Sequence, residues 1–356
     1  MKAFHCDICG SLVFFENFRC LKCNHALGFL PDLIDLSTID SAGNGLYRAL
    51  APEARLRLYK PCANTQQYQI CNWLIPIEDL NTFCAACRLN VVIPDLTISE
   101  NIELWRQLEA AKRRMIYTLL RLNISTEGAP DQSRSPLRFR FMTDAADGKS
   151  VMTGHDNGMI TINLAEADPA ERERRRVSLR EPFRTLLGHM RHEVAHFYWG
   201  EVVENTRYLE PFRNLFGDER QGYVTSLQNY YRQGAPSDWR TRHVSAYAAS
   251  HPWEDWAETS AHYFHISDTV ETAASFGVAL RPKHPDAQAM TADPKSIPDL
   301  NTPFPKILEQ WLPLTFALNE LNRGMGLPDL YPFALSSVAI EKLSFVHEVL
   351  RHPGRN

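Results

Sequence analysis

Residues 192–196 read His-Glu-Val-Ala-His, an H-E-x-x-H pattern that constrains this chain more than any other stretch. On a helix, residues four apart lie on the same face, so the two imidazoles can bind one zinc ion. Glu193 can then take a proton from a water in the open coordination position and pass it to a leaving amine. The pattern predicts a hydrolytic zinc site, and two solvent-facing histidines are the alternative. His189, one turn earlier, is interpreted as a supporting or surface residue.

The flanking sequence predicts a helix over residues 179–199. Ser178 and Glu181 form an S-x-x-E capping box, and Pro182 falls in the first turn, where its missing N–H is tolerated. Gly200 is typical of a C-terminal stop. Apolar residues recur at steps of three and four and predict one buried face: Phe183, Leu187, Met190, Val194 and Phe197. The metal-binding pattern lies off this stripe, on a side that we expect to border a cleft.

All eight cysteines lie within the first 87 residues. Two C-x-x-C knuckles predict a tetrahedral four-cysteine zinc site: Cys6, Cys9, Cys20 and Cys23. The other four predict a second site: Cys62, Cys71, Cys84 and Cys87. A cross-braced exchange of pairs between the two sets is an open alternative. Neither set leaves an open coordination position, so both sites are predicted to be structural and to stabilise a segment too short to bury much core.

Composition excludes several functional classes. Hydrophobic residues make up 44% of the 356 residues and charged residues 22%, a balance typical of globular proteins. The net charge of -4 gives no electrostatic basis for binding nucleic acid or anionic membranes. The sequence has no apolar signal region at its start and no run of about 18 apolar residues, so we expect neither secretion nor a membrane span. Metal-binding thiols suit a reducing compartment, and the predicted location is the cytoplasm.

Three parts are predicted along the chain. Residues 1–95 would form a zinc-ribbon module with both four-cysteine sites, and residues 96–125 a long connecting helix with acidic residues early and basic residues late. Residues 126–356 would form the main domain, mostly helical with a small β-hairpin or sheet. Asn157-Gly158 predicts a hairpin turn there, followed by a strand over residues 160–164 whose edge could bind an extended peptide. The predicted fold class is therefore α+β.

A hydrolytic zinc site needs a third protein ligand. The pattern H-E-x-x-H-x-x-G-x-x-H is excluded, because Trp199 and Val202 occupy the glycine and third-histidine positions. Two acidic candidates follow. Asp218 is the alternative, and Glu254, in the first turn of a predicted helix, is preferred. Glu258 lies one turn after Glu254 on the same face, where it could accept a hydrogen bond from a ligand histidine and fix its tautomer.

Residues 245–258 read Ser-Ala-Tyr-Ala-Ala-Ser-His-Pro-Trp-Glu-Asp-Trp-Ala-Glu. This stretch resembles the S-x-Y-A…P-x-E-D-x-A-E segment of gluzincin peptidases related to anthrax lethal factor. With its cysteine-rich front, essentially the whole chain resembles a bacterial family of zinc-binding metallopeptidases with an N-terminal zinc ribbon. The resemblance implies a zincin-like domain in which Glu254 is the third zinc ligand and Tyr247 stabilises the oxyanion of the tetrahedral intermediate. Lethal factor lacks the cysteine-rich front, so the likeness implies no substrate.

Tyr247 is also chemically suited to this role. A phenol can donate a hydrogen bond to a developing oxyanion without titrating near neutral pH. A core tyrosine is the alternative interpretation. Four other tyrosines are weaker candidates for this role, and a core position is the preferred interpretation for them: Tyr223, Tyr230, Tyr231 and Tyr331.

The expected function is that of a zinc-dependent peptidase acting on a peptide or protein substrate, an endopeptidase rather than an aminopeptidase. We expect one catalytic zinc on His192, His196 and Glu254, and two structural zinc ions on the cysteines. Glu193 would be general base and then general acid. The alternative class is a catalytically silent zinc-ribbon protein that binds a protein or nucleic acid, against which the intact Glu193 and the net charge argue. The sequence gives no indication of oligomeric state.

Overall fold

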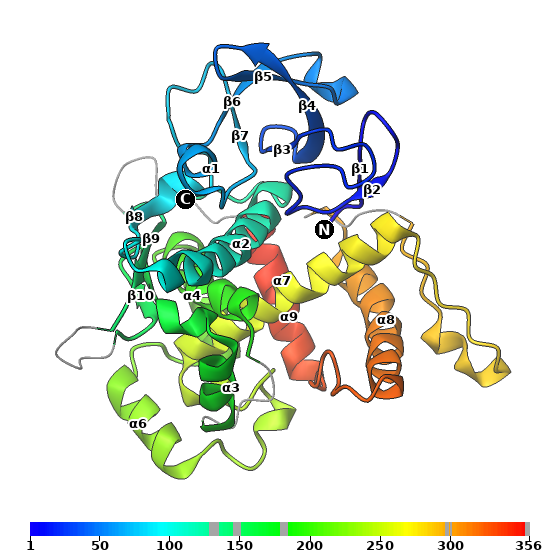
Figure 1. Cartoon of the computed structure of the whole chain (residues 1–356). Helices are drawn as coiled ribbons and strands as arrows, with labels where there is room; N and C mark the ends of the chain where they lie inside the picture. The colour runs from blue at the N-terminus through cyan, green and yellow to red at the C-terminus, as the bar shows by residue number, and fades with distance from the viewer. Residues whose placement is uncertain (128–134, 145–150, 179–183, 296–298, 300, 353–356) are drawn as a thin grey trace.

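The computed structural model describes residues 1–127, 135–144, 151–178, 184–295, 299 and 301–352 (Figure 1). Within these ranges helices predominate, and the strands form a two-stranded, a four-stranded and a five-stranded sheet. The α+β class predicted from the sequence is therefore confirmed. None of the helices in these ranges combines the length and the apolar character of a membrane-spanning segment.

The N-terminal part of the chain, blue to cyan in Figure 1, is an assembly of short strands. β1 (Phe4–His5) pairs with β2 (Leu12–Val13) across the first knuckle. Five antiparallel strands then pair in chain order: β3 (Leu27–Leu30), β4 (Asp35–Gly43), β5 (Leu46–Ala49), β6 (Leu58–Pro61) and β7 (Leu74–Pro76). The short helix α1 (Ala63–Tyr68) follows β6. We call residues 1–95 the ribbon segment.

Three packed helices form the centre of the structure after the ribbon segment. α4 (Leu186–Val202) carries the H-E-x-x-H motif and packs against both α2 (Ser99–Arg121) and α7 (Pro252–Phe276). α8 (Phe304–Gly324) and α9 (Ser337–Arg351) pack on α7. Three shorter helices complete this part: α3 (Pro169–Ser178), α5 (Leu209–Phe216) and α6 (Tyr223–Gln233).

The predicted boundaries of the motif helix are wrong. α4 begins at Leu186, because the Thr185 side chain accepts a hydrogen bond from the amide of Gly188 at 3.0 Å and caps the helix there. Ser178 is instead the last residue of α3, and Glu181, Pro182 and Phe183 lie outside the described residues. Gly200 does not end α4, which continues to Val202. A glycine stop requires the left-handed conformation, and Gly200 is not among the glycines with positive φ.

The four-stranded sheet lies beside α4. Its order is β10 (Gly154–Asp156), β11 (Met159–Asn163), β9 (Arg138–Met142) and β8 (Asn90–Val92). The predicted turn is confirmed, since Asn157 and Gly158 have φ values of 43° and 81° between the antiparallel strands β10 and β11. The expectation that residues 160–164 form an edge is wrong. β11 lies between two partners, and β10 is the edge strand that contacts α4.

Aromatic side chains join the ribbon segment to α2, which lies directly beneath it in Figure 1. The ring of Tyr117 lies 5.5 Å from that of Phe15 and 6.1 Å from that of Phe29. Nearer the start of α2, the ring of Trp105 meets that of Tyr68 edge-on at 5.8 Å. Both α2 residues are fully buried. The ribbon segment therefore covers an apolar face of α2 that water would otherwise contact.

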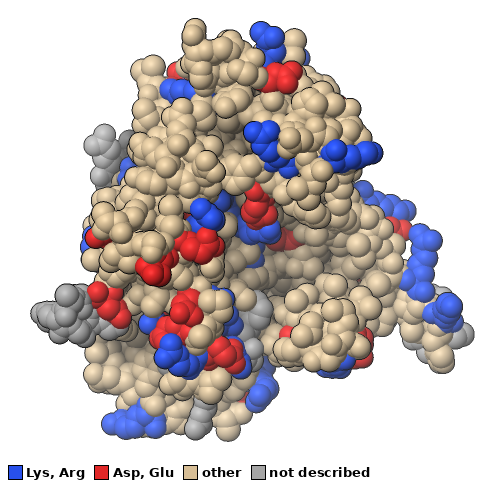
Figure 2. Space-filling view, viewed as in Figure 1, with Lys and Arg blue, Asp and Glu red and all other residues tan. Residues whose placement is uncertain are grey.

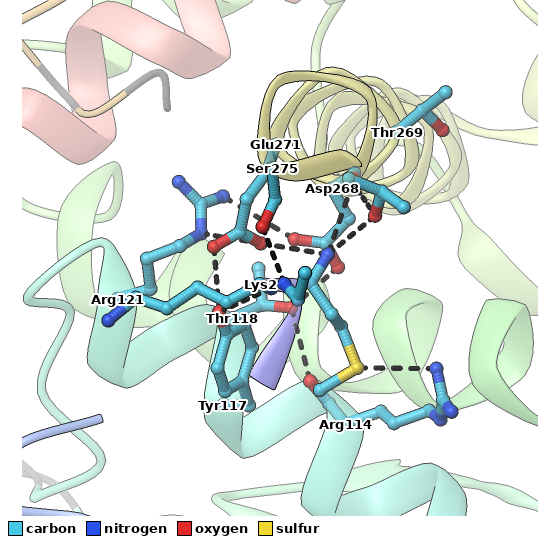
Figure 3. A network of polar contacts seen from close by, with 12 residues as sticks. Lys2, Arg114, Tyr117, Thr118, Arg121, Asp268, Thr269, Glu271 and Ser275 are labelled. Atoms are coloured by element: carbon cyan, nitrogen blue, oxygen red, sulfur yellow. Dashed lines mark hydrogen bonds and ion pairs between the residues drawn. The ribbon is translucent and has the colours of Figure 1, made fainter. Parts of the chain in front are cut away.

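A buried polar network extends this contact to α7 (Figure 3). Tyr117 donates to Glu271 at 2.7 Å, and the amine of Met1 lies 3.0 Å from the second oxygen of Glu271. One helical turn earlier, Asp268 forms an ion pair with Arg191 of α4. Because Arg191 precedes the motif directly, the ribbon segment, α2, α7 and α4 form one connected unit.

We predict that residues 96–356 do not fold as a separate domain. Without the ribbon segment, Trp105 and Tyr117 of α2 would be exposed to water, and the four-stranded sheet would lack β8. The fragment should bind a hydrophobic dye and show no cooperative thermal transition, whereas the full chain should show one. A fragment that unfolds cooperatively within a few degrees of the full chain would contradict this expectation.

Candidate active site and metal centres

Two helices bring the three predicted catalytic ligands together. α4 presents His192 and His196, and the first turn of α7 presents Glu254. The Nε2 atoms of the histidines lie 3.2 Å apart, and Oε2 of Glu254 lies 3.0 Å from the first and 3.6 Å from the second. All three side chains are buried. Their donor atoms converge on one point, as a shared cation requires.

These donors fit zinc. Ligands at about 2.05 Å in a tetrahedron lie about 3.3 Å apart, close to the three separations found. Nδ1 of His192 faces Glu258, which leaves its Nε2 toward Glu254 and His196. A cation between these three atoms would stabilise the arrangement. Burial alone would lower the pKa of His192, but Glu254 and Glu258 outweigh it and raise this pKa well above its ordinary value.

Glu258 holds the first histidine from behind. Its Oε1 lies 2.7 Å from Nδ1 of His192, and its Oε2 accepts a hydrogen bond from Ser245 at 2.6 Å. The Ser245 hydroxyl in turn accepts from the amide of Ala248 at 3.1 Å. This chain of contacts fixes the imidazole tautomer that leaves Nε2 available to a metal.

Glu193 lies beside the ligand set and faces the same cleft. His189 Nε2 lies 3.2 Å from Glu193 Oε1, and its other nitrogen lies 3.7 Å from Glu166. Arg184 and Arg175 also pair with Glu166, at 3.0 Å and 2.8 Å. Burial opposes a charge on His189, but the two carboxylates raise its pKa to about 9. Burial raises and His189 lowers the pKa of Glu193, and the net decrease keeps this carboxylate ionised.

A cavity of about 580 Å³ opens in front of these residues. α6 forms one wall with four side chains: Tyr223, Leu227, Tyr230 and Tyr231. Among the described residues, those that line the cavity begin at Val151 in chain order. None of them belongs to the ribbon segment, which therefore forms no wall of the cleft. Tyr247, at the start of a short 3-10 turn (Tyr247–Ser250), lies in this cavity with its ring 5.9 Å from His192. Burial raises the pKa of Tyr247 well above its ordinary value, so the phenol remains a donor.

Asp218 and Tyr223 do not lie where the sequence predicted. Asp218 does not join the ligand set, and its carboxylate pairs with Arg220 at 2.8 Å on the surface. Tyr223 is not a core residue. It is 37% exposed, and its hydroxyl donates to Oε1 of Glu254 at 2.7 Å. No local pattern around Tyr223 predicts this contact, because its partner lies 31 residues away.

The eight cysteines form two sets in chain order, without a cross-braced exchange. Sulfur atoms lie 3.5 Å apart in Cys6 and Cys23, and 3.6 Å apart in Cys9 and Cys20. In the second set, Cys71 and Cys84 are separated by 3.7 Å. Four thiolates at about 2.3 Å from zinc lie about 3.8 Å apart, so both sets fit a structural zinc ion. All eight thiols are free of disulfides.

The second cysteine set lies against α2. Its four thiols are fully buried, and Glu109 Oε2 lies 3.8 Å from the sulfur of Cys87. The guanidinium of buried Arg113 lies near the same thiols, and its Nη1 makes no hydrogen bond to a described residue. A zinc ion with four thiolates carries two negative charges, and Arg113 supplies positive charge beside it, while Lys112 pairs with Glu109 at 2.7 Å.

Comparisons with known proteins agree with this arrangement. Residues 101–349 match the family described as "Putative zinc-binding metallo-peptidase", and residues 3–98 match a zinc-ribbon domain. Uncharacterised proteins of Mycobacterium tuberculosis and Mycobacterium bovis are each 40% identical over 351 residues, which cover 98% of this chain and 95% of the relative. No solved structure matches the chain.

The matched ranges contain both cysteine sets and the three converging donors of the main domain. The family match covers well over half of the chain, and the relatives match almost all of it. The chain therefore belongs to the family of zinc-binding metallopeptidases and carries a zinc-ribbon domain in front of the peptidase region.

Proposed function

We propose that this chain is a gluzincin-type zinc endopeptidase with one catalytic and two structural zinc ions. The observation that carries the proposal is the convergence of His192, His196 and Glu254 on one point, with Glu193 and Tyr247 facing the same cavity. Zinc held by these three ligands would act as a Lewis acid that polarises the scissile carbonyl and acidifies the attacking water.

The side chains of the cleft supply the remaining chemistry. Glu193 takes the proton of the attacking water and delivers it to the leaving amine. Its contact with His189 holds the carboxylate in the cleft. Tyr247 donates a hydrogen bond to the oxygen on which negative charge develops. β10 is the edge strand of the described four-stranded sheet and contacts α4, so an extended substrate could pair with it as a further strand.

The carboxylates of the cleft favour endopeptidase over aminopeptidase activity. An aminopeptidase needs acidic groups for the free substrate amine, but each described carboxylate in the lining and ligand set already has partners. Glu166 pairs with two arginines, Glu193 with His189, and Glu258 with His192 and Ser245. The free thiols favour a reducing compartment, so we propose that the chain acts in the cytoplasm.

The Glu193→Gln variant should keep its zinc, and its peptidase activity should fall by about 10²- to 10⁴-fold, because the amide cannot accept the proton. The assay is mass-spectrometric detection of cleavage in a library of peptides with blocked N-termini. Glu201→Gln, on the same helix but outside the cleft, is the matched control and should retain activity. Near-normal cleavage by Glu193→Gln would overturn the mechanism.

Tyr247→Phe should lower kcat by about 10²- to 10³-fold with little change in KM, because the lost hydrogen bond forms only as the oxyanion develops. Steady-state kinetics on one cleaved peptide measures this split. An increase in KM at constant kcat would instead assign Tyr247 to ground-state binding.

Elemental analysis should find three zinc ions per full chain, and two after replacement of both His192 and His196 by alanine. The loss of one ion with an unchanged far-UV spectrum assigns that ion to the motif. Two ions in both folded proteins, after zinc is restored to the purification buffers, would favour a silent zinc-ribbon protein.

A further inference from the structure

Helix α6 has an unusual relation to the rest of the domain. It contains no fully buried residue, yet four of its side chains form a wall of the cleft. A helix held by so little burial depends on specific contacts for its position. The contact that reaches furthest into the site is made by its first residue, Tyr223.

The two oxygens of Glu254 have different partners. Oε2 faces the two histidine nitrogens, and Oε1 accepts the hydrogen bond of Tyr223 at 2.7 Å. Glu254 is 1% exposed, so no bulk water competes for this second oxygen. The phenol thereby occupies one lone pair of the oxygen that the carboxylate would need in order to bind the same cation through both oxygens.

The surroundings of Tyr223 fix its ring in this position. The ring meets those of His251 and Trp253 edge-on, at 5.2 Å and 6.1 Å, and both partners lie at the start of α7 beside Glu254. Trp253 in turn lies 5.8 Å from the ring of His196. Tyr223 therefore contacts the turn that carries the third ligand through its ring as well as through its hydroxyl.

We propose that Tyr223 is a positioning residue that restricts Glu254 to one metal-binding oxygen and ties helix α6 to the metal centre. The proposal rests on the metal site of the proposed function, but not on peptidase activity. A carboxylate that binds through one oxygen leaves a coordination position for water and substrate. Because α6 is also a wall of the cleft, this hydrogen bond links the position of that wall to the geometry of the third ligand.

The test compares Tyr223→Phe with Tyr231→Phe in the full chain. Each variant removes one phenolic hydroxyl from the same cleft-facing helix, and the hydroxyl of Tyr223 is the one that donates to Glu254 at 2.7 Å. The zinc dissociation constant of the catalytic site is measured by competition with a chelator, with the two cysteine sites kept loaded. Replacement of that zinc by Co²⁺ then reports coordination number through the intensity of its visible d–d absorption.

Tyr223→Phe should weaken zinc binding by roughly 10- to 100-fold, as expected for loss of a group that orients a ligand. Its Co²⁺ form should absorb more weakly, as the coordination number rises when Glu254 binds through both oxygens. Tyr231→Phe should leave both properties unchanged. Equal dissociation constants and equal Co²⁺ spectra for Tyr223→Phe and the wild type would overturn the proposal.

A double-mutant cycle separates this role from a general effect on folding. In a Glu254→Gln background, the further change Tyr223→Phe should have almost no effect on the dissociation constant, because Tyr223 acts through that carboxylate. A full effect in that background would overturn the proposal. A wild-type chain that binds zinc at His192 and His196 but cleaves no peptide would refute the peptidase function alone.

Discussion

The packing of α4 against α7 determines the geometry of the whole site. Small side chains allow the two helices to approach, since Ala195 and Ala257 are fully buried. The indole of Trp256 donates to the backbone carbonyl of Ala195 at 2.8 Å and fixes the relative position of the helices. One turn before this contact His192 emerges from α4, and two residues before it Glu254 emerges from α7. A shift between the helices would separate the donors, so the site is as rigid as this interface.

Much of the site could be predicted from sequence, because many of its residues occur in short sequence patterns. The spacing of the two histidines, the cysteine knuckles and the Asn157-Gly158 turn are decided by residues within a few positions. The contacts of Glu166 with His189 and of Tyr223 with Glu254 are different in kind. They join elements whose mutual position depends on tertiary packing. The predicted start of α4 is wrong for a local reason. Ser178 and Thr185 are both residue types that cap helices, and the sequence does not rank one above the other.

The ribbon segment contributes to the peptidase region in a way that its cysteines alone do not suggest. It forms no wall of the cleft among the described residues, and it covers α2 with aromatic rings. Figure 2 shows basic and acidic residues intermixed over the visible face, consistent with the net charge of -4. No broad basic area of the kind that binds nucleic acid is visible on this face. The contacts of the ribbon segment therefore support a structural contribution.

Strand β8 gives this arrangement a consequence for the order in which the molecule folds. β8 pairs in parallel with β9, and α2 is the crossover between them. The chain between two parallel strands must lose conformational entropy before the strands can form hydrogen bonds. Such non-local pairing therefore forms slowly. During synthesis, β8 leaves the ribosome well before β9, so the sheet beside α4 cannot be completed while only the ribbon segment exists. The cysteines of the ribbon segment are synthesised first, and the histidine and glutamate donors of α4 and α7 follow later.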